Sequence, residues 1–404
     1  MSETKVAVDK FDSLLTDAGP AAIVFRRKLM PVEGKDSWIF PPTFAQSESA
    51  DEDEEGGGGT YQIDPLPNDE RRNVCLIDSI GSQANRIEPL FKKEPYSALV
   101  PQVRVKLKDG DEVNLLDAGH RAADAVVRFS RSYGPRFWDA FSKYRKHRDC
   151  SDLVKLAPTS LLFGVWDSRG TGVKIQRIVR SVVRGYDVTP AKRRATYRAP
   201  YEYTSNGVIA QALDNGKGKN NPLSEQGFKY SLAPETHGGV LVKGDICQEA
   251  VINLVALRSL SNDRPTQRYL LGLALVALSY RDQEGFNLRE GCLLCAASTE
   301  DFDGKWTVVK FDSTKDETAL KGFTHELALA FAQSTAKDVP IDQPSPDTFD
   351  SDTAEAWLKL KKEKRKVLAK SKHPARAIAD ETAKAPKEKH QQADSVAADQ
   401  TETK

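Results

Sequence analysis

The pattern of hydrophobic and polar positions is most informative between residues 73 and 91. Residues 73–78 form a short apolar run, which predicts a buried strand. Asp78 or Ser79 can cap a helix that begins directly after this strand. Four apolar side chains then recur at helical spacing on one face: Ile80, Ala84, Ile87 and Phe91. The pattern therefore predicts a strand, a turn and an amphipathic helix.

The opposite face of this helix is polar and contains no carboxylate before Glu88. It carries four side chains, flanked by Asn85: Ser79, Ser82, Gln83 and Arg86. A helix start with free N–H groups and small hydroxyl side chains can bind an anion. An ordinary solvated helix face fits the same pattern equally well, so the residues alone leave both interpretations open.

Residues 156–198 repeat this arrangement with more charge. Thr159–Trp166 predicts a buried strand, and residues 167–172 predict a turn with two glycines. Lys174–Arg184 predicts an amphipathic helix with an apolar face of isoleucine and valine. Its other face is cationic: Lys174, Arg177, Arg180 and Arg184.

Positive charge is concentrated in the same region. Residues 167–198 contain nine basic residues and two acids, a net charge of +7 in a chain whose net charge is +1. The basic residues also include Arg169, Arg193 and Arg194. A solvated face normally mixes both signs, whereas concentrated positive charge is typical of a surface that binds a polyanion. This stretch therefore favours nucleic-acid or phosphate binding.

The pattern of the remaining chain predicts a mixture of α-helices and β-strands. Further strands are predicted at Ala21–Leu29, Gln102–Leu107, Gly291–Ser298 and Trp306–Phe311. Further helices are predicted at Asp117–Phe129, Pro135–Arg148, Ile246–Ser261, Pro265–Tyr280 and Asp316–Gln333. The aromatic residues of the segment from Pro135 to Arg148 recur at helical spacing, which favours packing over base stacking.

Composition divides the chain into a core and peripheral segments. Residues 1–335 form the predicted core, with an acidic, glycine-rich loop at 46–60 that we expect to be mobile. An arm at about residues 190–240 is rich in glycine, lysine and asparagine, as expected of a flexible segment that meets phosphate or another subunit. Residues 336–404 predict a flexible, lysine-rich tail that contains one charged helical stretch at Thr353–Lys372.

Several function classes find no support. No apolar run approaches the 18 or so residues of a membrane span. Five cysteines without a signal peptide indicate reduced thiols and a cytoplasmic protein. The pair Cys292 and Cys295 lacks further zinc ligands, and His237 lacks a catalytic partner nearby. With no nucleotide-binding glycine motif either, we expect no metal and no cofactor.

Four segments match a known family in the same order: NVCLIDSIGSQANRIEPLF, DAGHRAADAVVR, LLFGVWDSRGTGVKIQRIVRS and SEQGFKYSLAPETHGGVLVKGDICQEAVINLVALRSL. Together they resemble the RAMP-superfamily backbone subunit of type I-U (I-G) CRISPR effector complexes, over about residues 20–335. The resemblance implies an α+β fold with a modified RRM-like (ferredoxin-like) core, a helical insertion and a thumb-like arm. The tail lies outside the resemblance.

The resemblance also implies a function. Such subunits polymerise along the guide crRNA as a non-catalytic scaffold in antiviral defence, holding sugar and phosphate so that the bases can pair with target DNA. Implied partners are the crRNA, target DNA through the guide, further copies of the chain in a helical filament, and the large and guide-end-capping subunits of Cascade. The implied gripping positions are Ser79, Ser82, Asn85, Arg86, Arg169, Lys174 and Arg177, to which the polar and charge patterns add Gln83, Arg180, Arg184, Arg193 and Arg194.

Two alternatives remain from the residues. The first is a RAMP-type ribonuclease that cuts bound target RNA, with Asp167 or Asp245 as the acid nearest to the basic segments. The second is a nucleotide-binding metabolic protein that holds a phosphate at the helix after Ser79. Neither aspartate belongs to a paired-carboxylate motif, and we therefore expect no enzymatic activity.

Overall fold

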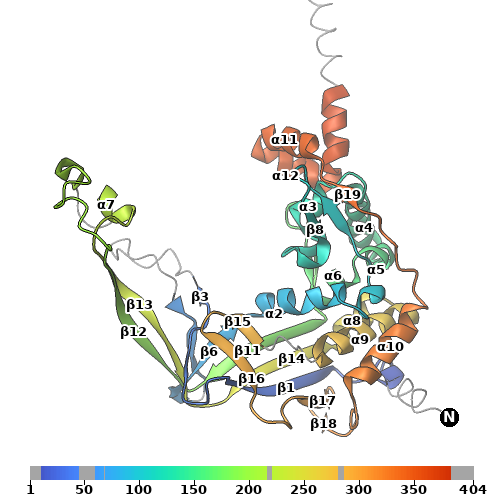
Figure 1. The fold of residues 1–404 in the computed structure, drawn as a ribbon. Helices are drawn as coiled ribbons and strands as arrows, with labels where there is room; N and C mark the ends of the chain where they lie inside the picture. The colour runs from blue at the N-terminus through green and yellow to red at the C-terminus, as the bar shows by residue number, and fades with distance from the viewer. Residues whose placement is uncertain (1–10, 45–59, 68, 216–220, 281–285, 384–404) are drawn as a thin grey trace, which may run out of the picture.

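A large antiparallel sheet carries two projections in the computed structural model, which describes residues 11–44, 60–67, 69–215, 221–280 and 286–383. Figure 1 shows helices on one face of the sheet, a long hairpin rising from one end and a helical region rising from the other. The fold is α+β, as the sequence predicted. The expected acidic loop at 46–60 lies outside the described residues except for Thr60.

The main sheet has nine strands in the order β15-β16-β1-β14-β11-β6-β5, and β17 pairs with both β1 and β18. The strands are β1 (Ala22–Pro31), β5 (Ile63–Leu66), β6 (Asp69–Asp78), β11 (Val179–Tyr186), β14 (Ile246–Asn253), β15 (Phe286–Arg289), β16 (Cys292–Ala296), β17 (Lys305–Val309) and β18 (Lys315–Asp316). All pairs in this sheet are antiparallel. The predicted strands at Ala21–Leu29, Gly291–Ser298 and Trp306–Phe311 are confirmed.

Helices cover one face of this sheet and leave the other open. Along β14 every second residue is buried, because alternate side chains of a strand point to opposite faces. The covering helices include α8 (Leu254–Leu260), α9 (Arg264–Ser279) and α10 (His325–Ala336). Helix α9 is buried over almost its whole length, which confirms the apolar helix predicted at Pro265–Tyr280.

A helical insertion, residues 88–163, separates β6 and α2 (Ile80–Ile87) from β11. It contains α3 (Ala125–Arg128), α4 (Tyr133–His147), α5 (Ser151–Leu156), α6 (Pro158–Phe163), four 3₁₀ turns and the hairpin of β7 (Arg104–Lys106) and β8 (Glu112–Asn114). Phe137 and Phe141 of α4 are buried in the main core, as their helical spacing predicted.

The arm is a hairpin of β12 (Val188–Tyr197) and β13 (Ser231–Val242), and it coincides with the arm predicted at about residues 190–240. A 3₁₀ turn (Gln211–Leu213) and α7 (Pro222–Glu225) lie at its far end (Figure 1). At its base β13 also pairs with β2 (Trp38–Ile39). The arm therefore extends the connection between two neighbouring strands of the main sheet.

Three predicted elements have the wrong type. Lys174–Arg184 is not a helix but β10 (Lys174–Ile175) and most of β11, whereas Thr159–Trp166 is mainly helix α6 followed by β9 (Val165–Trp166). Ile246–Ser261 is strand β14 followed by helix α8. Valine- and isoleucine-rich segments of this length fit both periods, and pairing in a central sheet position favours the strand.

Two predicted helices are shorter than expected. Only residues 125–128 of Asp117–Phe129 are α-helical, because 3₁₀ turns form its first part. Of Asp316–Gln333, only the end belongs to α10, which begins after Thr324, whose side chain accepts a hydrogen bond from the Leu327 N–H.

The predicted flexible tail is wrong for residues 336–383. This segment contains β19 (Asp347–Thr348), α11 (Ser351–Lys359), α12 (Lys362–Ser371) and a further helix at 374–383. We refer to residues 347–383 as the C-terminal cap. Trp357 of the cap is 7% exposed and packs in a cluster with Phe129 of the insertion, and β19 pairs with β7. Residues 384–404 lie outside the described part of the chain.

Candidate nucleic-acid interface

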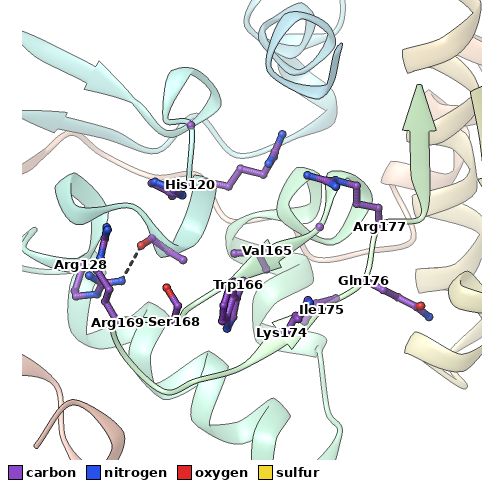
Figure 2. A pocket seen from close by; sticks show the side chains of 14 residues that line it. His120, Arg128, Val165, Trp166, Ser168, Arg169, Lys174, Ile175, Gln176 and Arg177 are labelled. Carbon is purple, nitrogen blue, oxygen red and sulfur yellow. Dashed lines mark hydrogen bonds between the residues drawn. The ribbon is translucent and has the colours of Figure 1, made fainter. Parts of the chain in front are cut away.

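A basic pocket of about 420 Å³ lies between the helical insertion and the β9–β10 hairpin. Figure 2 shows Arg128 and Arg169 close together at one end of the pocket, Trp166 and Lys174 near its middle and Arg177 towards its other end. We call it the basic pocket; its lining is Gly119, His120, Arg121, Ala123, Arg128, Gly164, Val165, Trp166, Ser168, Arg169, Lys174, Ile175, Gln176 and Arg177. No carboxylate is among these residues, so the charge of the lining favours an anion.

The turn between β9 and β10 is closed by the buried carboxylate of Asp167. Its Oδ2 accepts hydrogen bonds from the Thr171 N–H at 2.6 Å and the Thr171 hydroxyl at 2.9 Å. Its Oδ1 accepts one from the Arg128 guanidinium at 3.0 Å. A Cβ on Gly170 would lie 2.3 Å from this carboxylate, so only glycine fits there. The turn holds Arg169 at the pocket wall.

Lys174 lies over an exposed tryptophan. Its Nζ is 5.4 Å from the centre of the Trp166 ring, and Trp166 is 59% exposed. A lysine beside an open aromatic face offers both charge and a stacking surface to a nucleic acid. The sequence prediction placed Trp166 in a buried strand and therefore missed it. Its position directly before Asp167-Ser168-Arg169 was the available signal.

Arg177 approaches the pocket from the segment between β10 and β11. Its Nε donates a hydrogen bond to the Phe163 carbonyl at 2.8 Å. The backbone of Gly164 has a φ of +81°, and a Cβ there would lie 2.6 Å from the Arg177 Cγ. Partial burial and the nearby charge of Arg121 lower the pKa of the Arg177 guanidinium. A bound anion would offset this repulsion.

Arg121 connects the pocket to α2. Its Nε donates to the Glu88 Oε2 at 2.6 Å and its Nη2 to the Asn85 Oδ1 at 3.1 Å. Its φ of +54° places it in the left-handed region, a strained conformation for a side chain of this size. Burial raises the pKa of Glu88 to about 7. Asn85, an expected gripping residue, is exposed, and its bond with Arg121 places it beside the basic pocket without lining it.

The remaining polar face of α2 serves the fold in part. Ser79 caps the helix by accepting a hydrogen bond from the Ser82 N–H at 3.2 Å. Both serines are half-buried. Gln83 is 2% exposed, and its amide contacts Asp78 at 2.6 Å, the Ser181 hydroxyl at 2.8 Å and Gln248 at 3.2 Å. The prediction that Gln83 lies on an exposed face is therefore wrong.

Arg86 is exposed in part but is held by other elements. Its Nε lies 3.2 Å from the Asp78 carboxylate, and its two terminal nitrogens donate to the carbonyls of Asn287 and Leu288 in β15. These bonds tie α2 to the edge of the sheet. The structure does not bring Arg86 to the basic pocket.

The other predicted residues lie elsewhere. Arg180 and Arg184 lie on the open face of the sheet, where Arg184 pairs with Glu249 at 3.0 Å. Arg193 is exposed on the arm, and the side chain of Arg194 lies outside the described part. The basic pocket thus brings together Arg169, Lys174 and Arg177 out of the predicted set.

Acids and thiols gather into no metal site among the described residues. Asp245 is on the open sheet face and pairs with Lys28 at 2.9 Å. All five cysteines are free, and burial raises the pKa of the Cys75 and Cys292 thiols to about 12. In the same ranges, no helix has the length and hydrophobicity required to cross a membrane.

A comparison with known proteins finds a family model that matches part of the chain. Residues 23–190 match the family described as CRISPR-associated protein GSU0053, a RAMP-type family. The matched segment runs from β1 through α2, the insertion and the basic pocket into β12. The resemblance to a RAMP-type CRISPR-associated protein, predicted from the motifs, is confirmed over these residues.

Two further comparisons add little. No curated protein matches the chain. A solved structure titled "CRISPR RNA-guided surveillance complex, pre-nicking" is 14% identical, covering 79% of this chain and 90% of that one, with a TM-score of 0.32. At that TM-score the likeness carries no argument about this chain.

Proposed function

We propose that the chain is a crRNA-binding backbone subunit of a type I-U/I-G Cascade complex. Copies of it polymerise along the guide and hold its sugar-phosphate backbone. The convergence of Arg169, Lys174 and Arg177 at one carboxylate-free pocket, within the matched family segment, carries this proposal. The other partners are target DNA, paired with the guide, and the large and guide-end-capping subunits.

The strand order supports an RRM-like core within the larger sheet. Strands β1, β11, β14 and β17 occur in this sequence order, with other strands between them, and lie side by side as β17-β1-β14-β11. The connection between the first two includes α2 and the helical insertion, the arm connects the second and third, and the connection between the third and fourth includes α8 and α9. This spatial order matches that of a ferredoxin-like unit of the type β-α-β-β-α-β and supports the proposed core, to which β6 would be added beside β11.

The proposed contact is with phosphate rather than with base edges. Lysine and arginine neutralise phosphate charge without reading sequence, so one subunit can hold any spacer. Trp166 can stack on any base, because every base has an aromatic face. Binding should therefore be independent of spacer sequence and fall steeply with salt.

A scaffold without catalysis is part of the proposal. The ribonuclease alternative needs an accessible acid, but the Asp167 carboxylate is buried and is bonded to Arg128 and Thr171. Asp245 lies on the open sheet face, where it pairs with Lys28, and does not line the basic pocket. A metal-dependent cut of bound RNA that disappears in Asp245→Asn would favour the ribonuclease instead.

The test is co-expression of the chain with a repeat-spacer RNA. The wild type should purify with RNA and form filaments in electron micrographs. Arg169→Gln/Lys174→Gln should purify with little RNA, while Lys310→Gln/Lys321→Gln, which removes two exposed lysines away from the pocket, should behave as wild type. Wild-type protein free of RNA, or equal losses in both pairs, would refute the proposal.

A further inference from the structure

The C-terminal cap presents a second cationic surface. Residues 359–372, which span the junction of α11 and α12, contain eight basic residues and one acid. The cap lies at the outer end of the helical insertion (Figure 1). None of its residues lines the basic pocket, so the two surfaces are distinct.

Some of these cations are paired within the cap and others are not. Lys364 pairs with Glu381, Lys372 with Asp380, and Lys366 with Glu363 at 3.3 Å. By contrast, three neighbouring lysines are exposed and form no ion pair within the described residues: Lys359, Lys361 and Lys362. We call these three the lysine cluster.

Two of the three lysines sit at a helix end that does not favour them, whereas Lys359 lies in the last turn of α11. Lys361 caps α12 and Lys362 begins it. The N-terminal end of a helix carries partial positive charge, so lysines there are electrostatically unfavourable. Lysines without an internal partner at such a position indicate an anionic partner outside the chain.

The cap holds this cluster rigidly. Trp138 Nε1 donates to the Ala369 carbonyl at 3.0 Å, and Arg376 forms two bonds of 2.7 Å with Asp139. Arg145 bridges the cap to the turn of the basic pocket, donating to the carbonyls of Lys370 at 3.0 Å and Thr171 at 2.9 Å. The cluster is therefore part of the folded body.

The side chains around the cluster indicate which nucleic acid it fits. The large exposed apolar residues of the cap are Leu358 and Val367, which are aliphatic, and Trp357 is buried. Surfaces that bind single strands combine cations with exposed aromatic rings, whereas a duplex has its bases stacked inside and offers phosphates. We propose that the lysine cluster binds the phosphate backbone of duplex DNA without reading its sequence. This goes beyond the proposed grip on the guide.

Fluorescence anisotropy of the full chain tests this with two probes, a random DNA duplex of about 30 base pairs and a single-stranded RNA. We expect Lys359→Gln/Lys361→Gln/Lys362→Gln to lower duplex affinity about tenfold and to make its dependence on salt less steep by about one unit for each phosphate that is no longer bound. RNA affinity should stay within about twofold, since the basic pocket is intact. The matched control is Lys310→Gln/Lys315→Gln/Lys321→Gln, three exposed lysines near β17 and β18.

Four outcomes would overturn the proposal: no duplex binding by the wild type, unchanged duplex affinity in the variant, an equal loss in the control, or an equal loss of RNA affinity. The last would assign the cluster to single strands. Circular dichroism melting confirms that each variant is folded. The measurement with the DNA duplex requires no guide RNA. A negative result there would therefore leave the proposed backbone role untouched, and the measurement with single-stranded RNA would still test that role.

Discussion

The polar face of α2 and the basic segment from Arg169 to Arg177 have similar sequence patterns but different surroundings. Gln83 and Arg86 of α2 bond to Asp78, to β11 or to β15, and thereby join the helix to the sheet. Arg169 and Lys174 instead lie on a hairpin at an open pocket without a carboxylate. Polar side chains that follow a buried strand can form hydrogen bonds within the fold. Basic side chains in a segment that has no neighbouring carboxylate cannot form ion pairs there and stay available to a partner.

The largest expected effect is on stability and concerns the C-terminal cap, which packs on the insertion that forms one wall of the basic pocket. Trp357→Ala should lower the free energy of unfolding by about 3–5 kcal/mol, because it empties the cluster that holds the cap on the insertion. Thermal or urea unfolding measures this. The matched change at 65% exposed Leu358, Leu358→Ala, should alter stability by less than about 0.5 kcal/mol. Equal stability of both variants would mean that the cap is not anchored through Trp357.

On the α2 side, Gln83→Ala should destabilise the fold by about 1–3 kcal/mol, because it removes the buried hydrogen bonds that Gln83 forms with Asp78, Ser181 and Gln248. Folded Gln83→Ala should still bind RNA with nearly wild-type affinity. Urea unfolding and RNA titration separate the two effects. An unchanged stability together with weaker RNA binding would place Gln83 at the interface and remove the contrast between the two regions.

Variants in the basic segment should lose RNA affinity and keep their stability, the opposite of the result expected for Gln83→Ala. Arg169→Ala and Lys174→Ala should each weaken RNA binding by about 1–2 kcal/mol, as charge-assisted contacts to phosphate do. Stability should change by less than about 0.5 kcal/mol, since both side chains are exposed. RNA titration at constant salt and a melting curve measure both quantities. Destabilised variants with normal RNA affinity would contradict this assignment.

A pH-dependent effect concerns the contact between the two regions. Burial raises the pKa of Glu88 from its ordinary value of about 4.5 to about 7, so the native state binds the proton more tightly than the unfolded state. The stability that this proton contributes is complete below about pH 4.5 and is lost as the pH rises to about 7. Unfolding of wild type and Glu88→Gln across this range should show a slope that the variant lacks. Parallel curves would mean that Glu88 titrates normally.

The sequence predicted the elements that depend on their own residues, and it failed for those that depend on partners distant in the chain. Helix α9 and strand β1 follow from apolar runs whose length and period are unambiguous. Lys174–Arg184 was expected to be a helix because its valines fit both periods; only its pairing partners β6 and β14 decide for strand. The role of Gln83 depends on Ser181 and Gln248, which are distant in sequence.

The sequence predicted that the site is positively charged, but it did not predict which residues line it. The excess of cations around Arg169 and Lys174 marked the correct segment, although its secondary structure was wrong. His120 and Arg121 join the pocket only because the insertion folds back onto the β9–β10 hairpin. Likewise, the sequence predicted a helical stretch at Thr353–Lys372 but not its packing on the insertion, since its lysine-rich composition resembles a solvated tail and the anchoring partners are distant in sequence.

The salt dependence of RNA binding tests the role of the basic pocket most directly. On a single strand the slope of log affinity against log salt falls by about 0.7 for each phosphate that the protein no longer binds. Arg169→Gln/Lys174→Gln should therefore flatten the slope by about 1.4, with an unchanged melting temperature. An unchanged slope in folded protein would show that these side chains do not contact the RNA backbone and would contradict the account.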